Sequence, residues 1–88
     1  MNLIKKYRQF YIHKTQTELA EEFDANGLKI HNFNGARGFR QSDISKLEKG
    51  LKTPDFMVCE YIAKKLNVTS EEVLKSVKPP QKPAQNPA

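Results

Sequence analysis

The segment Ser42–Pro54 combines side chains that can bind a polyanion with a pattern that folds them into a short helix. Ile44 and Leu47 stand three positions apart and give this helix one apolar side, and Gly50 is a natural left-handed stop. The other helical positions carry hydroxyl, carboxyl and ammonium groups that would face solvent. A short basic helix held by apolar residues against a small helical core is the physical form of a DNA recognition element.

Positive charge is concentrated around this segment. The chain has 15 Lys and Arg against 10 Asp and Glu, which gives a net charge of +5. Between Lys29 and Lys52, six basic residues oppose two acidic ones, so this window alone carries +4. Such a field favours a polyanionic partner, and binding that neutralises phosphates weakens steeply as salt is added.

Length and composition limit the chain to one small domain. Four of the five prolines follow Lys75, so we expect a folded unit over 1–76 and a disordered Pro/Lys-rich tail over 77–88. A single cysteine, Cys59, excludes an internal disulfide and favours a reducing compartment. No apolar run approaches the roughly 18 residues of a membrane span, and the N-terminus lacks the apolar centre of a signal peptide. We therefore expect a cytoplasmic protein with no membrane partner.

Apolar periodicity and helix caps predict five helices, over about 2–12, 15–24, 41–49, 53–66 and 70–77. Capping boxes at Thr15–Glu18 and Thr69–Glu72 open the second and fifth helices, and Thr53 with Pro54 is expected to open the fourth. The expected core side chains are Leu3, Ile4, Tyr7, Phe10, Tyr11, Leu19, Ala20, Phe23, Phe56, Cys59, Ile62, Ala63, Leu66, Val73, Leu74 and Val77. Residues 24–39, rich in Asn and Gly, are compatible with a short β-hairpin or an irregular loop.

Three runs, in this order, resemble the Cro/CI-type (XRE) helix-turn-helix family, which includes the lambdoid phage repressors. They are Thr15–Phe23, Ile44–Gly50, and Thr53–Pro54 followed by Ile62–Leu74. The likeness extends over nearly all of residues 3–75 except the middle. It implies an all-α, compact, five-helix lambda-repressor-like domain whose helix-turn-helix motif regulates transcription as a repressor or a Cro-like protein. It also implies double-stranded DNA as the partner and a homodimer as the binding unit.

The resemblance also implies roles for particular side chains, because the second helix of this motif enters the major groove. The positions matching base contacts are Gln41, Ser42, Ser45 and Lys46, and those matching or flanking phosphate contacts are Gln16, Arg40, Lys49 and Lys52. Gln can bond adenine at two atoms and Lys can donate to guanine. A structural ion pair is expected between Arg8 and Glu48.

The chain departs from the family in the turn of the motif. Ala20 and Ile44 are 24 positions apart, where the family has about ten, so about 14 residues are inserted near Asp24–Gly38. Phe39 is expected to pack as the apolar residue of the turn, and Arg37 is a further candidate contact from the inserted loop. Asp43 would disfavour phosphates unless it caps its helix, pairs with Arg40 or accepts from a cytosine amine.

Other functions stay open at this stage. The insertion and Asp43 would also suit an antirepressor that binds another DNA-binding protein on the same scaffold, and an autoregulating antitoxin with a toxin partner is a third reading. Catalysis is not expected: His13 and His31 have no Cys or acidic companions at metal-ligand spacing, and Cys59 falls on an apolar stripe. We expect no metal ion and no cofactor.

Overall fold

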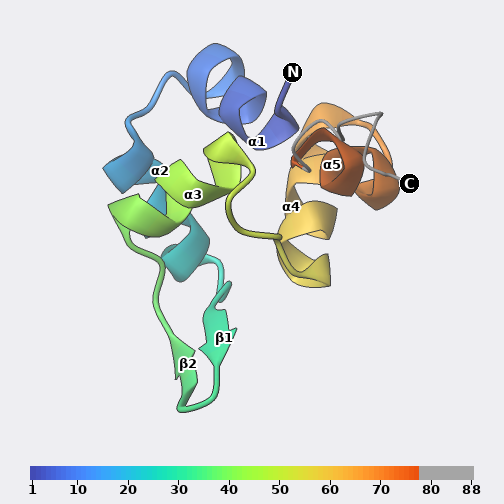
Figure 1. Cartoon of the computed structure of the whole chain (residues 1–88). Helices are drawn as coiled ribbons and strands as arrows, with labels where there is room; N and C mark the ends of the chain where they lie inside the picture. Colours follow the sequence, from blue (N-terminus) through green and yellow to red (C-terminus); the bar gives the residue numbers. More distant parts are fainter. Residues whose placement is uncertain (78–88) are drawn as a thin grey trace, which may run out of the picture.

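The computed structural model describes residues 1–77. Its elements are α1 (Leu3–Lys6), the π-helical turn η1 (Tyr7–Tyr11), α2 (Gln16–Ala25), β1 (Ile30–Asn32), β2 (Gly35–Arg37), α3 (Gln41–Lys49), α4 (Phe56–Leu66) and α5 (Ser70–Val77). The described part is mostly helical, with one two-stranded antiparallel sheet (Figure 1). Val77 is the buried last residue of α5, so the packed unit passes the predicted boundary by one residue. The rest of the predicted tail, 78–88, lies outside the described residues.

One hydrophobic core joins all the helices. Phe23 is fully buried, and its ring meets Phe39 edge-on at 5.0 Å and Tyr61 edge-on at 5.7 Å between centroids. Phe39 therefore takes the inward place expected of it beyond the insertion. Other fully buried side chains come from α1, α2, α3, α4 and α5: Ile4, Leu19, Ile44, Leu47, Val58, Ile62 and Val73. The apolar sides of the helices thus meet around Phe23, and the polar sides face solvent.

The helix ends follow local side-chain chemistry. The capping boxes of Thr15 with Glu18 and of Thr69 with Glu72 are both formed as predicted. The expected cap of the fourth helix was wrong: α4 begins at Phe56, and Asp55 accepts from the Val58 backbone N–H at 3.1 Å. A carboxylate caps a helix as well as a hydroxyl does, so the helix can begin after Asp55 and leave Thr53 in the connection.

Three aromatic residues expected in the core are exposed. Phe10 and Tyr11 lie in η1, where the Ile12 N–H bonds the Tyr7 carbonyl five residues back and widens the turn. The wider turn rotates later side chains off the inward face, and Phe10 and Tyr11 are 59% and 51% exposed. Phe56, the first residue of α4, is 66% exposed. A three- or four-residue spacing cannot anticipate the change of helical period within the first helix.

A partly buried polar contact also joins three helical segments. The Glu22 carboxylate accepts hydrogen bonds from the Tyr7 and Tyr61 hydroxyls, the second at 2.6 Å, and so links α2 to η1 and α4. Burial, together with the bond to Glu22, raises the pKa of Tyr61 to about 12. Both tyrosines therefore keep their protons at neutral pH and act as donors to one carboxylate.

Candidate nucleic-acid interface

Helix α3 has a strict division between an inward and an outward face. Asp43, Ile44 and Leu47 are at most 2% exposed and face the core. The predicted base-contacting residues are on the other face, where Gln41, Ser42 and Lys46 are exposed and Ser45 is half-buried. The helix runs from Gln41 to Lys49 and ends at Gly50, whose φ of 75° lies in the left-handed region. Both the bounds and the outward set match the sequence prediction.

The first carboxylate of α3 is held by the inserted segment. Asp43 accepts from both terminal nitrogens of Arg37, at 2.7 and 2.9 Å, and from the Arg40 backbone N–H at 2.8 Å. The Arg37 guanidinium, with the Arg40 N–H, holds the pKa of this carboxyl below its usual value. Of the roles foreseen for Asp43, capping is present, but its charged partner is Arg37 rather than Arg40. Arg37, predicted as a nucleic-acid contact, is therefore engaged within the protein.

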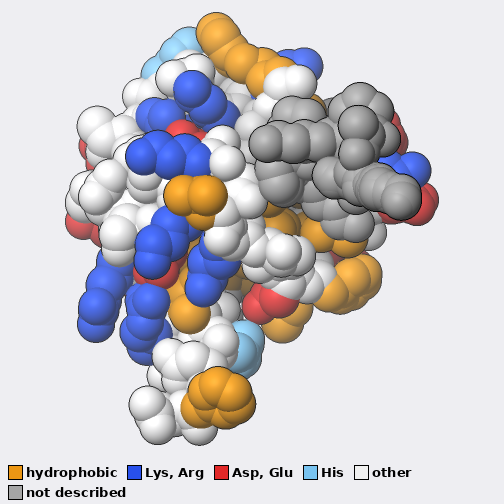
Figure 2. Space-filling model, in the orientation of Figure 1, with side chains coloured by type: hydrophobic (Ala, Val, Ile, Leu, Met, Phe, Trp, Pro, Cys, Tyr) orange, Lys and Arg blue, Asp and Glu red, His pale blue; other side chains and the backbone are white. Residues whose placement is uncertain are grey.

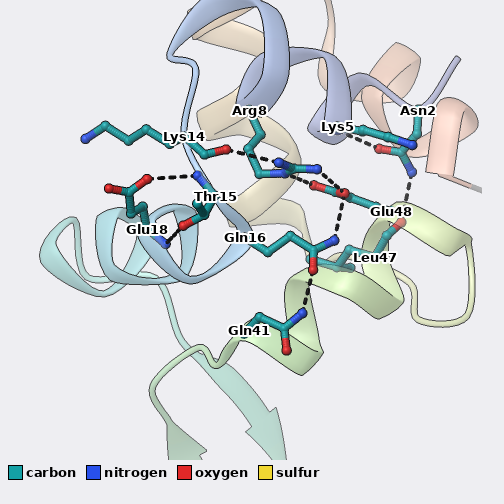
Figure 3. A network of polar contacts seen from close by, with 10 residues as sticks. All are labelled: Asn2, Lys5, Arg8, Lys14, Thr15, Gln16, Glu18, Gln41, Leu47 and Glu48. Atoms are coloured by element: carbon teal, nitrogen blue, oxygen red, sulfur yellow. Dashed lines mark hydrogen bonds and ion pairs between the residues drawn. The ribbon is translucent and has the colours of Figure 1, made fainter.

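The second carboxylate of α3 is held by the first helical segment, as predicted. Arg8 donates from Nε to Glu48 Oε2 at 2.6 Å and from a terminal nitrogen to Oε1 at 2.9 Å. The other terminal nitrogen of Arg8 donates to the Lys14 carbonyl at 3.0 Å, and Gln16 Nε2 donates to Glu48 Oε1 at 3.0 Å (Figure 3). The Glu48 side chain is only 4% exposed. Its charge is thus compensated inside the protein.

Gln16 connects the beginnings of α2 and α3. Its Oε1 accepts from Gln41 Nε2 at 2.5 Å while its amide nitrogen is bonded to Glu48 (Figure 3). The proposed phosphate contact Gln16 and the proposed base contact Gln41 are therefore adjacent, although 25 positions separate them in sequence. These bonds connect the Gln41 carboxamide, through Gln16, to the Glu48 carboxylate.

Cations surround the outward face of α3. Arg40 and Lys49 are exposed at its two ends, and Lys52 follows it and is half-buried. Figure 2 shows Lys and Arg side chains gathered over α3 and the base of the hairpin. Within α3, which is described throughout, both carboxylates face inward and each is bonded to an arginine. The outward face consequently presents amide, hydroxyl and ammonium groups without an opposing carboxylate.

The inserted residues form a β-hairpin, one of the two alternatives for 24–39. Ile30 pairs with Arg37 and Asn32 with Gly35, and the hairpin projects from the body beside the start of α3 (Figure 1). Asp24 Oδ1 accepts from the Phe39 N–H at 2.7 Å and so joins the two ends of the insertion. This role of Asp24 was not predicted, because no periodic pattern links residues 15 positions apart across a turn.

Among residues 1–77, no group of three or more His, Cys, Asp or Glu residues is placed to hold a metal ion. Burial raises the pKa of the Cys59 thiol above its ordinary value. None of the described helices has the length and apolar character needed to cross a membrane.

Comparisons with protein-family models, with curated proteins and with solved structures find no match to this chain.

Proposed function

We propose that this chain is a sequence-specific double-stranded DNA-binding regulator, a repressor or Cro-like protein of the lambda-repressor-like type. In this proposal α2 and α3 are the two helices of a helix-turn-helix motif, and α3 is the recognition helix in the major groove. The observation that carries this proposal is the separation of the side chains of α3 into an inward face and an outward face. Its two carboxylates, on Asp43 and Glu48, are bonded to arginines inside the protein. A phosphate backbone that approaches α3 therefore meets cations and neutral donors.

The outward side chains suit base recognition. Gln41 gives one amide hydrogen to Gln16, which leaves its Oε1 and its second amide hydrogen free to bond adenine N6 and N7. Lys46, one turn further along, is exposed and can donate to guanine O6 and N7. Ser42 and Ser45 lie on the same face and can donate or accept. The hydrogen bond to Gln16 restricts the Gln41 carboxamide before DNA binds, which reduces the entropy lost on binding.

The cations flanking α3 suit phosphate contacts. Arg40 precedes the helix, and Lys49 and Lys52 lie at and beyond its end. Gln16 lies in the first turn of α2, where the helix dipole favours an anion. These contacts would position α3 without selecting a sequence, and they predict strong salt dependence.

A homodimer reading two half-sites about 34 Å apart is part of this proposal. The apolar residues of α5 do not by themselves define the interface of this homodimer. Val73 and Val77 are 0% and 3% exposed within one chain, and Leu74 is half-buried against the same core. These three residues are therefore already used by the fold of the protomer.

Selection from a random duplex library at low salt tests the proposal. We expect the full chain to enrich one motif, and we expect Lys46→Ala to lose preference at a single base pair, at a cost of about 1–3 kcal/mol. The matched control is Lys64→Ala, which removes the same charge from an exposed position on α4 and should leave the motif unchanged. Enrichment of no motif, or equal effects of the two variants, would count against the proposal. Capture of a partner protein without any DNA binding would favour the antirepressor reading.

A further inference from the structure

We propose that the β-hairpin is a second DNA-contacting element, which enters the minor groove next to the major groove occupied by α3 and places Phe33 there as an apolar wedge. This inference rests on the proposed function and adds to it the position of the inserted segment on the duplex. Four features carry it: the attachment of the hairpin to α3, the exposure of its tip, its length and the charge at its base.

The hairpin is attached firmly to the recognition helix. An isolated pair of three-residue strands is only marginally stable in water. Here the base is held by the buried side chains of Leu28, Ile30 and Phe39, and Arg37 of β2 is bonded at two points to Asp43 of α3. The hairpin and the start of α3 should therefore move as one body, so a duplex bound by α3 meets the hairpin in a fixed orientation.

The tip presents an aromatic side chain that the protein does not use for folding. Phe33 and Asn34 form the loop between the strands, and Gly35 adopts the positive φ of 112° that completes it. Phe33 is fully exposed, at 107%, whereas Phe23 and Phe39 are in the core. Figure 2 shows a hydrophobic side chain at this tip, beyond the cluster of Lys and Arg. Proteins that bind the minor groove commonly insert such a side chain between base steps.

The length of the hairpin matches the spacing of the grooves. Phe33 at the tip and Phe39 next to α3 are six positions apart, so at about 3.3 Å per residue the backbone between them spans at most about 20 Å. The centres of adjacent major and minor grooves on one duplex face are about half a helical turn, or about 17 Å, apart. A hairpin of this length can therefore reach the neighbouring minor groove while α3 remains in the major groove.

The base of the hairpin is suited to the phosphate backbone that separates the two grooves. A hollow between the hairpin and the α3–α4 connection is lined by Lys29, His31 and Lys52. Asp55, the one carboxylate among its lining residues, is engaged as the cap of α4 and lies 3.9 Å from His31. Lys29 and Lys52 can thus neutralise phosphates of a backbone that passes between the hairpin and the α3–α4 connection.

The test compares Phe33→Ala with the control Phe56→Ala, which removes the same side chain from α4, where it is 66% exposed. The probe is the duplex of highest affinity from the selection. In this duplex, 2-aminopurine replaces one base at the step half a turn from the α3 site, where the minor groove would face the hairpin. We expect wild type and Phe56→Ala to raise the 2-aminopurine fluorescence by unstacking the base. Phe33→Ala should abolish this rise and weaken binding about tenfold, with the selected major-groove motif unchanged.

The outcomes separate this inference from the proposed function. If the full chain selects a motif but Phe33→Ala leaves both fluorescence and affinity as in wild type, the hairpin inference is overturned and the major-groove proposal stands. If no duplex is selected, both are overturned. As a second readout, Lys29→Ala should reduce the slope of log affinity against log salt by about 1. If the slope for Lys29→Ala equals that of wild type, Lys29 does not contact a phosphate and the base of the hairpin does not lie on the DNA backbone.

Discussion

Arg8→Ala is expected to lower the free energy of unfolding by about 4 kcal/mol, a large part of the stability of a domain this small. The variant would leave the Glu48 carboxylate, 4% exposed, with Gln16 as its remaining side-chain partner. A buried charge that loses its counter-ion costs more than the ion pair contributed, because desolvation is no longer compensated. With a slope of about 1 kcal/mol per molar urea, the midpoint of unfolding should fall by about 4 M.

Two comparisons isolate the cause of this loss. Glu71→Ala breaks a pair with Lys75 in which both side chains are at least 70% exposed, and it should change stability by less than about 0.5 kcal/mol. Combining Arg8→Met with Glu48→Leu removes both buried charges and should recover most of the stability lost in Arg8→Ala. An Arg8→Ala midpoint no lower than that of Glu71→Ala would show that the buried pair does not hold η1 against α3.

Asp43→Ala is expected to destabilise the protein by about 2 kcal/mol and to loosen both the start of α3 and the hairpin. The carboxylate receives the Arg40 N–H at the beginning of α3 and the Arg37 guanidinium from β2. Amide hydrogen exchange should therefore accelerate in β1, β2 and the first turn of α3 more than in α4 and α5. Uniform acceleration over the whole chain would contradict this role of Asp43.

The same carboxylate predicts a pH dependence. Its folded pKa is depressed, chiefly by Arg37, so its contribution is fully present above the unfolded pKa and is lost as pH falls below about 4 through the folded value. Asp43→Asn keeps an oxygen that can accept from the Arg40 N–H but removes the charge. The variant should be less stable than wild type at pH 6, and the difference should shrink toward pH 2. A constant difference over this range would mean that the charge of Asp43 does not stabilise the fold.

Much of the helical framework follows from local patterns in the sequence. α3 has the predicted bounds because Ile44, Leu47 and Gly50 define its inward side and its end within one short segment. α2 and α5 begin at capping boxes for the same local reason. The bond between Arg8 and Glu48 was expected from the resemblance to a family rather than from spacing, and the two residues are 40 positions apart.

The features that the sequence could not predict depend on contacts across the insertion or on a change of helical period. Neither Arg37 with Asp43 nor Asp24 with Phe39 could be paired before the hairpin was known. The π-helical turn at Tyr7–Tyr11 moved Phe10 out of the core although its spacing from Tyr7 is that of an α-helical face. These contacts decide how the candidate interface is oriented, so its geometry required the three-dimensional structure.

In the function proposed for this chain, a DNA duplex lies on the outward face of α3. The most direct measurement is the change in backbone amide ¹H–¹⁵N shifts when the selected duplex is added to the full chain at low salt. We expect the largest changes in Gln41–Lys49, at the beginning of α2 and in the hairpin, with small changes in α4 and α5. Changes confined to the exposed surface of α4 around Phe56 and Met57, or no change at saturating duplex, would contradict it.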